Sequence, residues 1–439
     1  MLRVNPKEVE NGDTFLALPG IDDDQIKLAI EKGATCIISD HGDFSVKTII
    51  EKDTRTYLSN YLKELNIEKF DKIKIIGIVG TSGKTVTGEI LCQLLNNLNS
   101  KTSCISTNGF YLNGEVENTK ETTPDIYELY EYINKSIENE CENIIIEVSS
   151  EAVIKRYIEG LRFDIVIFTN LYALNRDFEK YMNTKIEVFK MLKKNGLAII
   201  NKQDDNYKYF TLPQNHNIFY ASEDSEYKIN NIYLSYENTI FDINENRVNI
   251  PLIGMHNVYN YLAAYTTLRE MHFPYEAIME VTNKLNQIEG RYQKIKYKDN
   301  LIVIDYAYNY EIIKNALNIT KKICLDKIVT IIGIDDDKDE VEISKIGDIV
   351  TSLSNYVIFT TNNLISEETE SKVVSTINNL ENNNYEIIAD RKYAIKKGIE
   401  LLKEKDILLI LGRGGEKKQN IDGMELVFND YNEIIKNIK

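Results

Sequence analysis

The chain has 439 residues, of which 43% are hydrophobic and 27% charged, with a formal net charge of -16 and a pI of about 5.0. This length predicts two to four domains, each with its own hydrophobic core. The acidic balance argues against a protein that coats nucleic acid or an anionic membrane, although loops and helix N-termini can still bind anionic nucleotides.

The five cysteines and four histidines are scattered along the chain, and no two cysteines form a CxxC pair. This spacing argues against a structural zinc site and against a redox motif, and we expect free thiols in a reducing compartment. The N-terminus lacks the apolar core of a signal peptide, and the apolar runs are too short to span a bilayer. We therefore expect a cytoplasmic protein.

Residues 1–70 have the pattern of a small α/β domain. Short strands are expected at 14–18 and 35–39, and helices at 24–32 and 54–65. The alternation of short apolar runs with amphipathic stretches predicts an N-terminal domain that is separate from the rest of the chain.

The middle segment, residues 71–294, contains longer apolar runs between amphipathic stretches. Strands are expected at 73–79, 143–148, 164–169 and 196–201, and helices at 84–98, 259–270 and 274–285. Short apolar runs bounded by helices predict a mostly parallel sheet that is covered on both faces.

The last segment, residues 295–439, alternates regularly between strands and helices. Strands are expected at 301–306, 328–333, 356–361, 385–388 and 407–411, and helices at 311–322, 343–352, 367–380 and 391–404. This order predicts a doubly wound, Rossmann-like sheet with ligands outside the carboxyl ends of its strands. The three segments together predict a three-domain α/β protein.

The strongest local signal is a glycine-rich run at residues 77–85, between an apolar strand and a helix. Glycines let backbone amides surround a phosphate, and the helix N-terminus adds partial positive charge. Lys84 can reach the β- and γ-phosphates, and the Thr85 hydroxyl suits Mg²⁺. The alternative is a glycine-rich turn with an incidental lysine. We expect the triphosphate to be held by Gly80, Thr81, Ser82, Gly83, Lys84 and Thr85, which by itself predicts an NTP-dependent protein and no more.

The loop resembles that of the Mur ligases of peptidoglycan assembly, and further motifs follow in the same order from about residue 10 to about 420. They are Thr122-Thr123-Pro124-Asp125, Glu147-Val148-Ser149-Ser150, Arg156, the Asn-rich residues 254–260, Gly290-Arg291, Asp305-Tyr306-Ala307, Asp390-Arg391 and residues 412–416. The Thr-Thr-Pro segment is most similar to that of the tripeptide synthetases, the MurE type.

The resemblance implies an ATP-dependent ligase that forms an amide through an acyl phosphate. It implies that residues 1–70 hold a UDP-sugar, residues 71–294 hold ATP, and residues 295–439 hold the amino acid. Lys84, Glu147 and Lys185 would be catalytic, and Mg²⁺ would be held by Thr85, Glu147 and a carbamylated Lys185. Further ATP contacts are expected from Asn257, Asn260, Arg291 and Asp305, and substrate contacts from Thr122, Thr123, Pro124, Ser149, Ser150, Arg156, Asn362, Asn363, Arg413 and Glu416.

The residues themselves leave other interpretations open. Glu147 and Asp305 could be solvated strand-end carboxylates, and Lys185 could be a surface lysine of a helix. Asn257 and Asn260 lie one helical turn apart, so both can face one ligand, but they could instead cap the helix.

The chain departs from the family at several polar positions. Asn175 stands where the family has a histidine metal ligand, and Tyr308 and Gly415 replace two other family histidines. Residues 362–365 read Asn-Asn-Leu-Ile and lack the arginine that could grip a second carboxylate, which argues against meso-diaminopimelate as the added residue.

Three functions remain open from the sequence. The first is addition of an amino acid to a UDP-N-acetylmuramoyl peptide. The second is a divergent family member that joins a different acid and amine, and the third is a non-catalytic nucleotide-binding protein. The expected partners are a nucleotide-sugar peptide and an amino acid, without nucleic acid or membrane insertion, and a monomer is expected.

Overall fold

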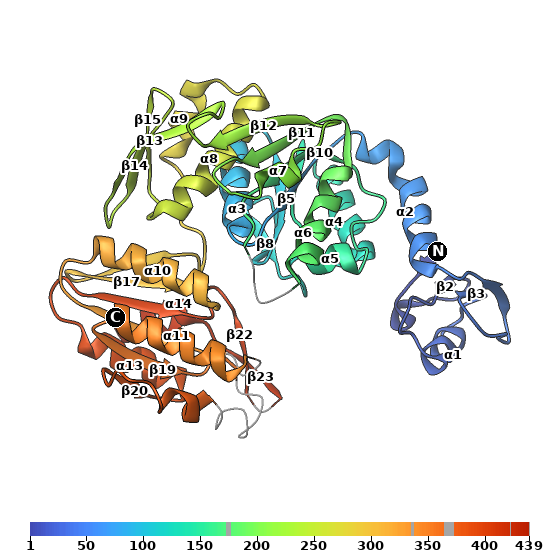
Figure 1. The fold of residues 1–439 in the computed structure, drawn as a ribbon. Coiled ribbons are helices and arrows are strands. Elements are labelled where there is room, and N and C mark those ends of the chain that lie inside the picture. The colour runs from blue at the N-terminus through green and yellow to red at the C-terminus, as the bar shows by residue number, and fades with distance from the viewer. Residues whose placement is uncertain (173–176, 335–337, 364–372, 422, 439) are drawn as a thin grey trace. The chain divides into compact units, whose positions relative to one another are not determined.

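The computed structural model describes residues 1–172, 177–334, 338–363, 373–421 and 423–438 (Figure 1). These residues form two compact units, one of residues 1–88 with 95–226 and the other of residues 89–94 with 227–439. Both units combine helices with mostly parallel sheets, so the predicted α/β class is confirmed. In the described part of the chain, no helix is long and apolar enough to cross a membrane.

The first unit begins with a four-stranded parallel sheet in the order β1-β2-β3-β4. Its strands are β1 (Leu2–Arg3), β2 (Thr14–Leu16), β3 (Cys36–Ser39) and β4 (Lys47–Ile50), with helices α1 (Asp23–Glu31) and α2 (Thr54–Phe70). Alternate strand residues point to opposite faces, so Phe15 and Ile37 pack on Ile26 of α1. This small core is the N-terminal α/β layer that the sequence predicts.

The central sheet of the same unit places the phosphate loop between two other strand ends. Its order is β12 (His216–Ala221), β11 (Leu192–Asn201), β10 (Phe163–Phe168), β5 (Lys74–Val79), β9 (Asn143–Glu147), β6 (Thr102–Ser106), β7 (Gly109–Leu112) and β8 (Glu115–Glu117). The strands from β12 to β6 are parallel, and β7 and β8 are antiparallel. The carboxyl ends of β10, β5 and β9 therefore meet at one edge.

Helices follow the strands of this sheet and cover it. They are α3 (Lys84–Asn97), α4 (Ile126–Glu138), α5 (Ser150–Ile154), α6 (Phe178–Lys190) and α7 (Tyr207–Phe210). The five residues Ile75 to Val79 of β5 are all buried, as expected for a strand covered on both faces.

The second unit contains antiparallel strands, two helices and a Rossmann-like sheet. Its first elements are β13 (Tyr227–Leu234), β14 (Thr239–Ile243), β15 (Asn246–Ile250), α8 (Met255–Glu270) and α9 (Tyr275–Thr282). The sheet order is then β16 (Gln293–Tyr297), β17 (Asn300–Asp305), β21 (Ile407–Leu411), β18 (Ile328–Gly333), β19 (Tyr356–Thr360) and β20 (Tyr385–Ile387), parallel except for β16.

Helices cover both faces of this second sheet, as a doubly wound fold requires. Val303 of β17 packs in the core with α10 (Tyr310–Ile323) and α11 (Glu340–Leu353), whereas Ile302 and Ile304 pack with α13 (Arg391–Leu401) and α14 (Asp430–Ile438). A two-stranded hairpin, β22 (Lys418–Ile421) with β23 (Met424–Val427), follows the last strand. The prediction of a doubly wound sheet is confirmed.

Some predicted bounds are wrong. The helix expected at 391–404 ends at Leu401, because Leu402 is extended and the side chain of Asp406 accepts the Lys403 amide at 2.8 Å. The helix expected at 259–270 begins at Met255, and the one expected at 274–285 covers Tyr275–Thr282. The helix expected at 367–380 falls partly outside the described residues, and residues 373–377 of it are helical.

Candidate active site

The phosphate loop connects β5 to α3 in the geometry that its sequence predicts. Gly83 has a φ of 82°, in the left-handed region that favours glycine, and a Cβ at Gly80 would lie 1.9 Å from Thr169 Oγ1. The first turn of α3 carries no acidic side chain, and Lys84 is its first residue. The positive end of this helix dipole is therefore directed at the loop without a carboxylate of its own helix to neutralise it.

Two residues that follow β10 hold the loop in shape. The Thr169 hydroxyl donates to Ser82 O at 2.7 Å, and Asn170 Oδ1 accepts the Ser82 amide at 2.9 Å. Asn170 O accepts the Thr81 amide at 2.9 Å. The structure thus places Thr81 and Ser82 in the predicted loop but directs both of their amides to Asn170.

Glu147 ends β9, directly beside β5, and its carboxylate lies at the head of α3. Its Oε2 accepts the Thr85 hydroxyl at 2.8 Å and the Thr107 amide at 2.9 Å, and its Oε1 lies 3.8 Å from Lys84 Nζ. The residue is 4% exposed, so it is not a solvated carboxylate. The structure brings Lys84, Thr85 and Glu147 together, and these hydroxyl and carboxylate oxygens are ligands that Mg²⁺ prefers.

Lys185 lies on α6 with its amine directed at the phosphate loop. Nζ donates to Gly80 O at 2.8 Å and to Ser150 Oγ at 3.1 Å, and it lies 4.4 Å from the centre of the Tyr181 ring. The side chain is 3% exposed, which excludes the surface-lysine interpretation. Asn175, the departure from the family's histidine, lies outside the described residues.

The Thr-Thr-Pro segment and the residues after Glu147 form one hydrogen-bonded group. The Thr123 hydroxyl donates to Glu147 O at 2.7 Å and accepts the Ser149 amide at 2.9 Å. Thr122 Oγ1 lies 3.2 Å from Thr107 Oγ1. Ser149 caps α5, and Pro124 follows Thr123 directly, so this segment runs beside the carboxylate of Glu147.

Arg156 contacts the N-terminal elements. Its guanidinium donates to Glu159 at 2.6 Å and to Asp53 at 2.9 Å, and a further bond reaches Thr56. The Thr56 amide and the Arg156 guanidinium hold the pKa of Asp53 well below its usual range. Among the described contacts, Arg156 is thus paired with carboxylates of the protein.

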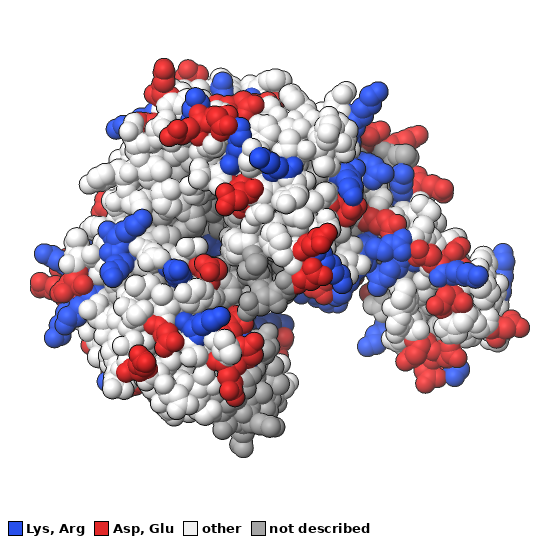
Figure 2. Space-filling model, in the orientation of Figure 1, with Lys and Arg blue, Asp and Glu red and all other residues white. Residues whose placement is uncertain are grey.

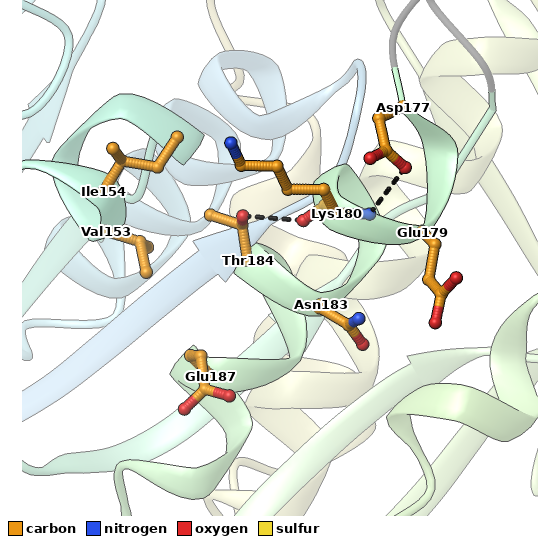
Figure 3. Close-up of a pocket in the computed structure, with 8 residues that line it drawn as sticks. All are labelled: Val153, Ile154, Asp177, Glu179, Lys180, Asn183, Thr184 and Glu187. Atoms are coloured by element: carbon orange, nitrogen blue, oxygen red, sulfur yellow. Dashed lines mark hydrogen bonds between the residues drawn. The ribbon is translucent and has the colours of Figure 1, made fainter.

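A pocket of about 470 Å³ opens between α5 and α6 (Figure 3). Figure 3 shows the Lys180 side chain reaching from α6 across this pocket toward Ile154. The lining residues are Val153, Ile154, Asp177, Glu179, Lys180, Asn183, Thr184 and Glu187. None of them was predicted as a site residue.

In the second unit, Asn257 and Asn260 are buried at the start of α8. Asn257 Nδ2 donates to Ile253 O at 2.8 Å, and Asn260 Nδ2 lies 3.4 Å from Asn257 Oδ1. The N-cap of α8 is Gly254, which makes no side-chain capping bond. Neither asparagine is therefore the N-cap, although Asn257 fixes the backbone just before the helix.

Arg291 and Asp305 meet at the entrance to the last sheet. The Arg291 guanidinium lies 4.3 Å from the centre of the Tyr306 ring, and Asp305 Oδ2 accepts the Tyr292 amide at 2.7 Å. Burial raises the pKa of Asp305 to about 6, against the effect of the Arg291 charge. Tyr308, at a family histidine position, packs edge-on to Tyr306 at 5.5 Å between ring centres.

Asn362 ties several strand ends of this sheet together. Its Nδ2 donates to Gly333 O at 3.1 Å, its Oδ1 accepts Arg391 at 3.2 Å, and its carbonyl oxygen accepts Arg413 at 2.8 Å. A Cβ at Gly333 would lie 1.9 Å from Asn362 Oδ1. The carboxamide therefore fills a space that only glycine leaves open.

The remaining predicted substrate residues of this unit bind one another. Arg413 is 1% exposed and lies 3.2 Å from the Glu416 carboxylate. Asn363 Oδ1 accepts the Asn420 amide at 2.9 Å. A Cβ at Gly290 would lie 1.8 Å from Gly415 N, so the Gly290-Arg291 segment packs closely on this loop. The structure brings the four predicted residues Asn362, Asn363, Arg413 and Glu416 together as one protein-internal network.

Comparison with known proteins decides the family. The model of the Mur ligase middle domain matches residues 78–268, and that of the Mur ligase glutamate ligase domain matches residues 290–414. A UDP-N-acetylmuramoyl-L-alanyl-D-glutamate--2,6-diaminopimelate ligase of Helicobacter pylori is 30% identical over 88% of this chain and 88% of its own length. The chain belongs to the Mur ligase family.

Other relatives align with this Mur ligase over almost its whole length. The corresponding ligase 2 of Clostridium acetobutylicum is 29% identical over 97% of this chain and 92% of its own. A solved 2,6-diaminopimelate ligase has a TM-score of 0.70 at 22% identity over 100% of this chain and 94% of its own. MurF of Thermotoga maritima, solved with ADP, has a TM-score of 0.69 at 18% identity, over 100% of this chain and 96% of its own. The Mur ligase is an ATP-dependent, ADP-forming ligase, as the sequence predicted.

Sequence reasoning missed three residues that shape the site of this Mur ligase. Thr107 binds Glu147, Asn170 braces the loop, and the Tyr181 hydroxyl lies 3.3 Å from Thr81 Oγ1. Asn170 lies in the run Phe168-Thr169-Asn170-Leu171, directly after the strand expected at 164–169, so the sequence held a signal for it. Thr107 follows the unpredicted strand β6 and had no such signal.

Proposed function

We propose that this Mur ligase adds an amino acid to the peptide carboxylate of a UDP-N-acetylmuramoyl peptide, in the synthesis of peptidoglycan precursors. The observation that supports it best is the cluster of Lys84, Thr85 and Glu147 at the head of α3. Full-length relatives are named as UDP-N-acetylmuramoyl-L-alanyl-D-glutamate--2,6-diaminopimelate ligases.

The reaction has two steps. A carboxylate oxygen of the acceptor attacks the γ-phosphorus of ATP, and the bond to the bridging β–γ oxygen breaks, which gives an acyl phosphate and ADP. The amine of the amino acid then attacks the acyl carbon, loses a proton, and displaces phosphate as the amide forms. Lys84 supplies a positive charge beside the transferring phosphoryl group, and the braced loop holds the nucleotide in position.

The residues at the head of α3 fit a Mg²⁺ ion. Thr85 and Glu147 would hold it, and Thr107 orients the carboxylate through two bonds of 2.9 and 3.1 Å. The ion would neutralise charge on the phosphate oxygens. Lys185 is buried next to Gly80 and Ser150, and carbamylation by CO₂ would turn its amine into an additional oxygen ligand. The amine would add CO₂ and lose a proton, and the resulting carbamate anion would be compensated in this buried place by the charge of the metal.

The amino acid is proposed to differ from meso-diaminopimelate, although relatives are named for that residue. Arg413 is committed to Asn362 O and to Glu416 and is 1% exposed. Leu364 and Ile365, which stand at the family's arginine segment, lie outside the described residues. The engagement of Arg413 within the protein also favours the second candidate function, a divergent ligase that joins a different acid and amine.

Several further expectations remain proposals. ATP and a nucleotide-activated sugar are intracellular metabolites, so the proposed reaction belongs in the cytoplasm. The domain boundaries 1–70, 71–294 and 295–439 and the monomeric state also remain predictions. Asn257, Asn260, Arg291 and Asp305 are proposed to lie near the nucleotide, on the strength of the family's motifs alone.

The test is phosphate release with ATP, Mg²⁺, a UDP-N-acetylmuramoyl dipeptide and single amino acids, with the product identified by mass. We expect release that depends on both the acid and one amino acid, and its loss in Lys84→Ala. Lys74→Ala is the matched control, because Lys74 is exposed at the other end of β5, about 20 Å away. ATP binding without turnover for any pair of substrates would refute the ligase function.

A further inference from the structure

We infer that Thr107 is a positioning residue that links binding of the acid substrate to binding of the metal. Its hydroxyl lies between Thr122, in the Thr-Thr-Pro segment, and the carboxylate of Glu147. Through this contact the acid and the metal strengthen each other's binding. The inference rests on the proposed function and on the expected contact between Thr122 and the acid.

The backbone of Thr107 is fixed by a two-residue turn. Strand β6 pairs with β7 through Ser106 and Gly109, so Thr107 and Asn108 alone connect the two strands. A Cβ at Gly109, where φ is 129°, would lie 2.5 Å from Glu117 O, so the turn closes tightly against β8. Short hairpin connections hold their flanking strands in one register. The amide and the hydroxyl of Thr107 therefore have a defined place at the end of β6.

Thr107 and the phosphate loop lie on opposite sides of Glu147. Strand β9 pairs on one side with β5, which leads into the loop, and on the other side with β6, which leads into Thr107. Thr107 is exposed, whereas Glu147 is 4% exposed, so the threonine reaches solvent beside a buried carboxylate. In-line attack on the γ-phosphorus brings the acid from the side opposite to ADP. We therefore place the acid on the Thr107 side of Glu147.

The two oxygens of the Glu147 carboxylate have different partners. Oε2 accepts the Thr85 hydroxyl at 2.8 Å, the Thr107 amide at 2.9 Å and the Thr107 hydroxyl at 3.1 Å. Oε1 lies 3.8 Å from Lys84 Nζ, beyond the length of a hydrogen bond. The three donors at Oε2 leave Oε1 as the oxygen that would face the metal. Because the Thr85 hydroxyl gives its proton to Oε2, its lone pairs are available to the same ion.

The hydroxyl of Thr107 has one proton and three oxygen neighbours. Glu147 Oε2 lies at 3.1 Å, Thr122 Oγ1 at 3.2 Å and Thr85 Oγ1 at 3.4 Å. An ionised carboxylate accepts a hydrogen bond more strongly than a hydroxyl, so the proton of Thr107 is directed at Glu147. The contact between Thr107 and Thr122 then requires Thr122 to be the donor. The three groups form a chain in which Thr122 donates to Thr107 and Thr107 donates to Glu147.

The direction of this chain determines the sign of the coupling. Consecutive hydrogen bonds polarise one another, so a hydroxyl that accepts a bond donates its own proton more strongly. When the acid accepts the Thr122 proton instead, the bond from Thr107 to Glu147 weakens, and more negative charge is left on the carboxylate. The metal is then held more tightly. By thermodynamic reciprocity, the acid is also bound more tightly when the metal is present.

Charge at long range is not expected to produce this coupling. Acidic and basic side chains are interspersed on the face of the molecule that Figure 2 shows. A surface of mixed sign produces only weak fields at a distance, and salt screens them further. A coupling that persists at about 0.15 M salt therefore reports on contacts close to Glu147.

The test measures the binding of Mn²⁺, as the probe for Mg²⁺, from the electron paramagnetic resonance of the free ion at about 0.15 M salt. The full-length protein is titrated with a non-hydrolysable ATP analogue present, once with and once without the UDP-N-acetylmuramoyl dipeptide. We expect the acid to lower the Kd of Mn²⁺ about fivefold in the parent and in Thr107→Ser, which keeps the hydroxyl. In Thr107→Val, which keeps the β-branch but has no hydroxyl, we expect a change of less than about twofold. A parent without coupling, or a Thr107→Val protein with the parent's coupling, overturns the inference.

Two further variants complete the design. Thr211→Val is the matched control, because the Thr211 hydroxyl donates to Tyr207 O at 3.1 Å, the same length as the bond from Thr107 to Glu147. Its coupling should equal that of the parent. Thr122→Val breaks the chain at its other end and should reduce the coupling at saturating acid as Thr107→Val does. If Thr107→Val does not fold, full coupling in Thr122→Val overturns the inference by itself.

Turnover separates the failure of this inference from the failure of the proposed function. The parent is assayed for phosphate release with ATP, Mg²⁺, the same acid and single amino acids. If the parent turns over and the loss of the Thr107 hydroxyl leaves the coupling unchanged, only the inference fails. If the parent turns over no pair of substrates, both fail.

Discussion

Glu147→Gln tests the metal clamp with the smallest change in shape. The substitution removes one negative charge and keeps an oxygen that can accept the Thr85 hydroxyl and the Thr107 amide, now at 2.8 and 2.9 Å. The new NH₂ group faces Lys84 Nζ, which lies 3.8 Å from Oε1. We therefore expect a folded protein, destabilised by about 1 kcal/mol through one poor contact.

The catalytic cost follows from the lost charge. Two unit charges about 4 Å apart attract by about 4 kcal/mol at an effective dielectric constant of 20. Loss of one preorganised charge-stabilising group typically costs about 2.7–4 kcal/mol, so kcat should fall about 10²–10³-fold. Because the carboxylate is also proposed to bind Mg²⁺, the Mg²⁺ concentration for half-maximal rate should rise by about 10–100-fold.

The assay is steady-state phosphate release over a Mg²⁺ titration, with thermal unfolding measured in parallel. Glu142→Gln is the control, because Glu142 is exposed just before β9 and binds Ser100 at 2.6 Å, so the same chemical change occurs at the opposite end of the strand. If Glu147→Gln keeps the kcat and Mg²⁺ dependence of the parent enzyme, Glu147 does not hold the metal.

Two further predictions concern Lys185 and Asp305. Lys185→Ala should lower kcat by about 10–100-fold or more, and added formate should restore part of the activity. The control Lys190→Ala, on the exposed face of α6, should not lower kcat. If Lys185→Ala and Lys190→Ala turn over at equal rates, Lys185 does not carry a carbamate that supports the metal. The pKa of Asp305, 3.8 in its ordinary state, is about 6 in the fold, so its contribution is complete below pH 3.8 and is lost as the pH rises through 6. That difference corresponds to about 3 kcal/mol, so the unfolding free energy of Asp305→Asn relative to the parent should rise from about pH 4 to about pH 7 in urea titrations. A difference that stays constant with pH would contradict it.

The elements that could be predicted are those whose buried residues form a pattern within one short stretch of sequence. Strands such as β5 and β21 are continuous apolar runs, and their flanking helices are amphipathic. The strand β6 was missed because Thr102, Ser103 and Ser106 are polar, and they are buried only because β9 and β7 lie on either side. Strand neighbours are a property of topology, which local patterns do not contain.

The same limit applies to the candidate site. Lys84, Thr85 and Glu147 could be predicted because a motif fixes each one at a strand end or helix start. Asn362 could be predicted as a site residue, but the direction of its side chain could not. Whether a polar side chain faces a ligand or a neighbouring strand depends on partners that are distant in the sequence, here Arg391 and Gly333. Thr107 could not be predicted, because its strand was not.

The contact between Gly80 and Thr169 has a consequence for how this chain can diverge. A Cβ at residue 80 would lie 1.9 Å from Thr169 Oγ1, and Asn170 already occupies the amides of Thr81 and Ser82. A substitution on either side therefore requires a compensating one on the other, so that residues 80–82 and 169–170 should vary together among descendants of this sequence. We therefore expect the end of β10 and the nucleotide loop to change together in evolution, although about ninety residues separate them in the sequence.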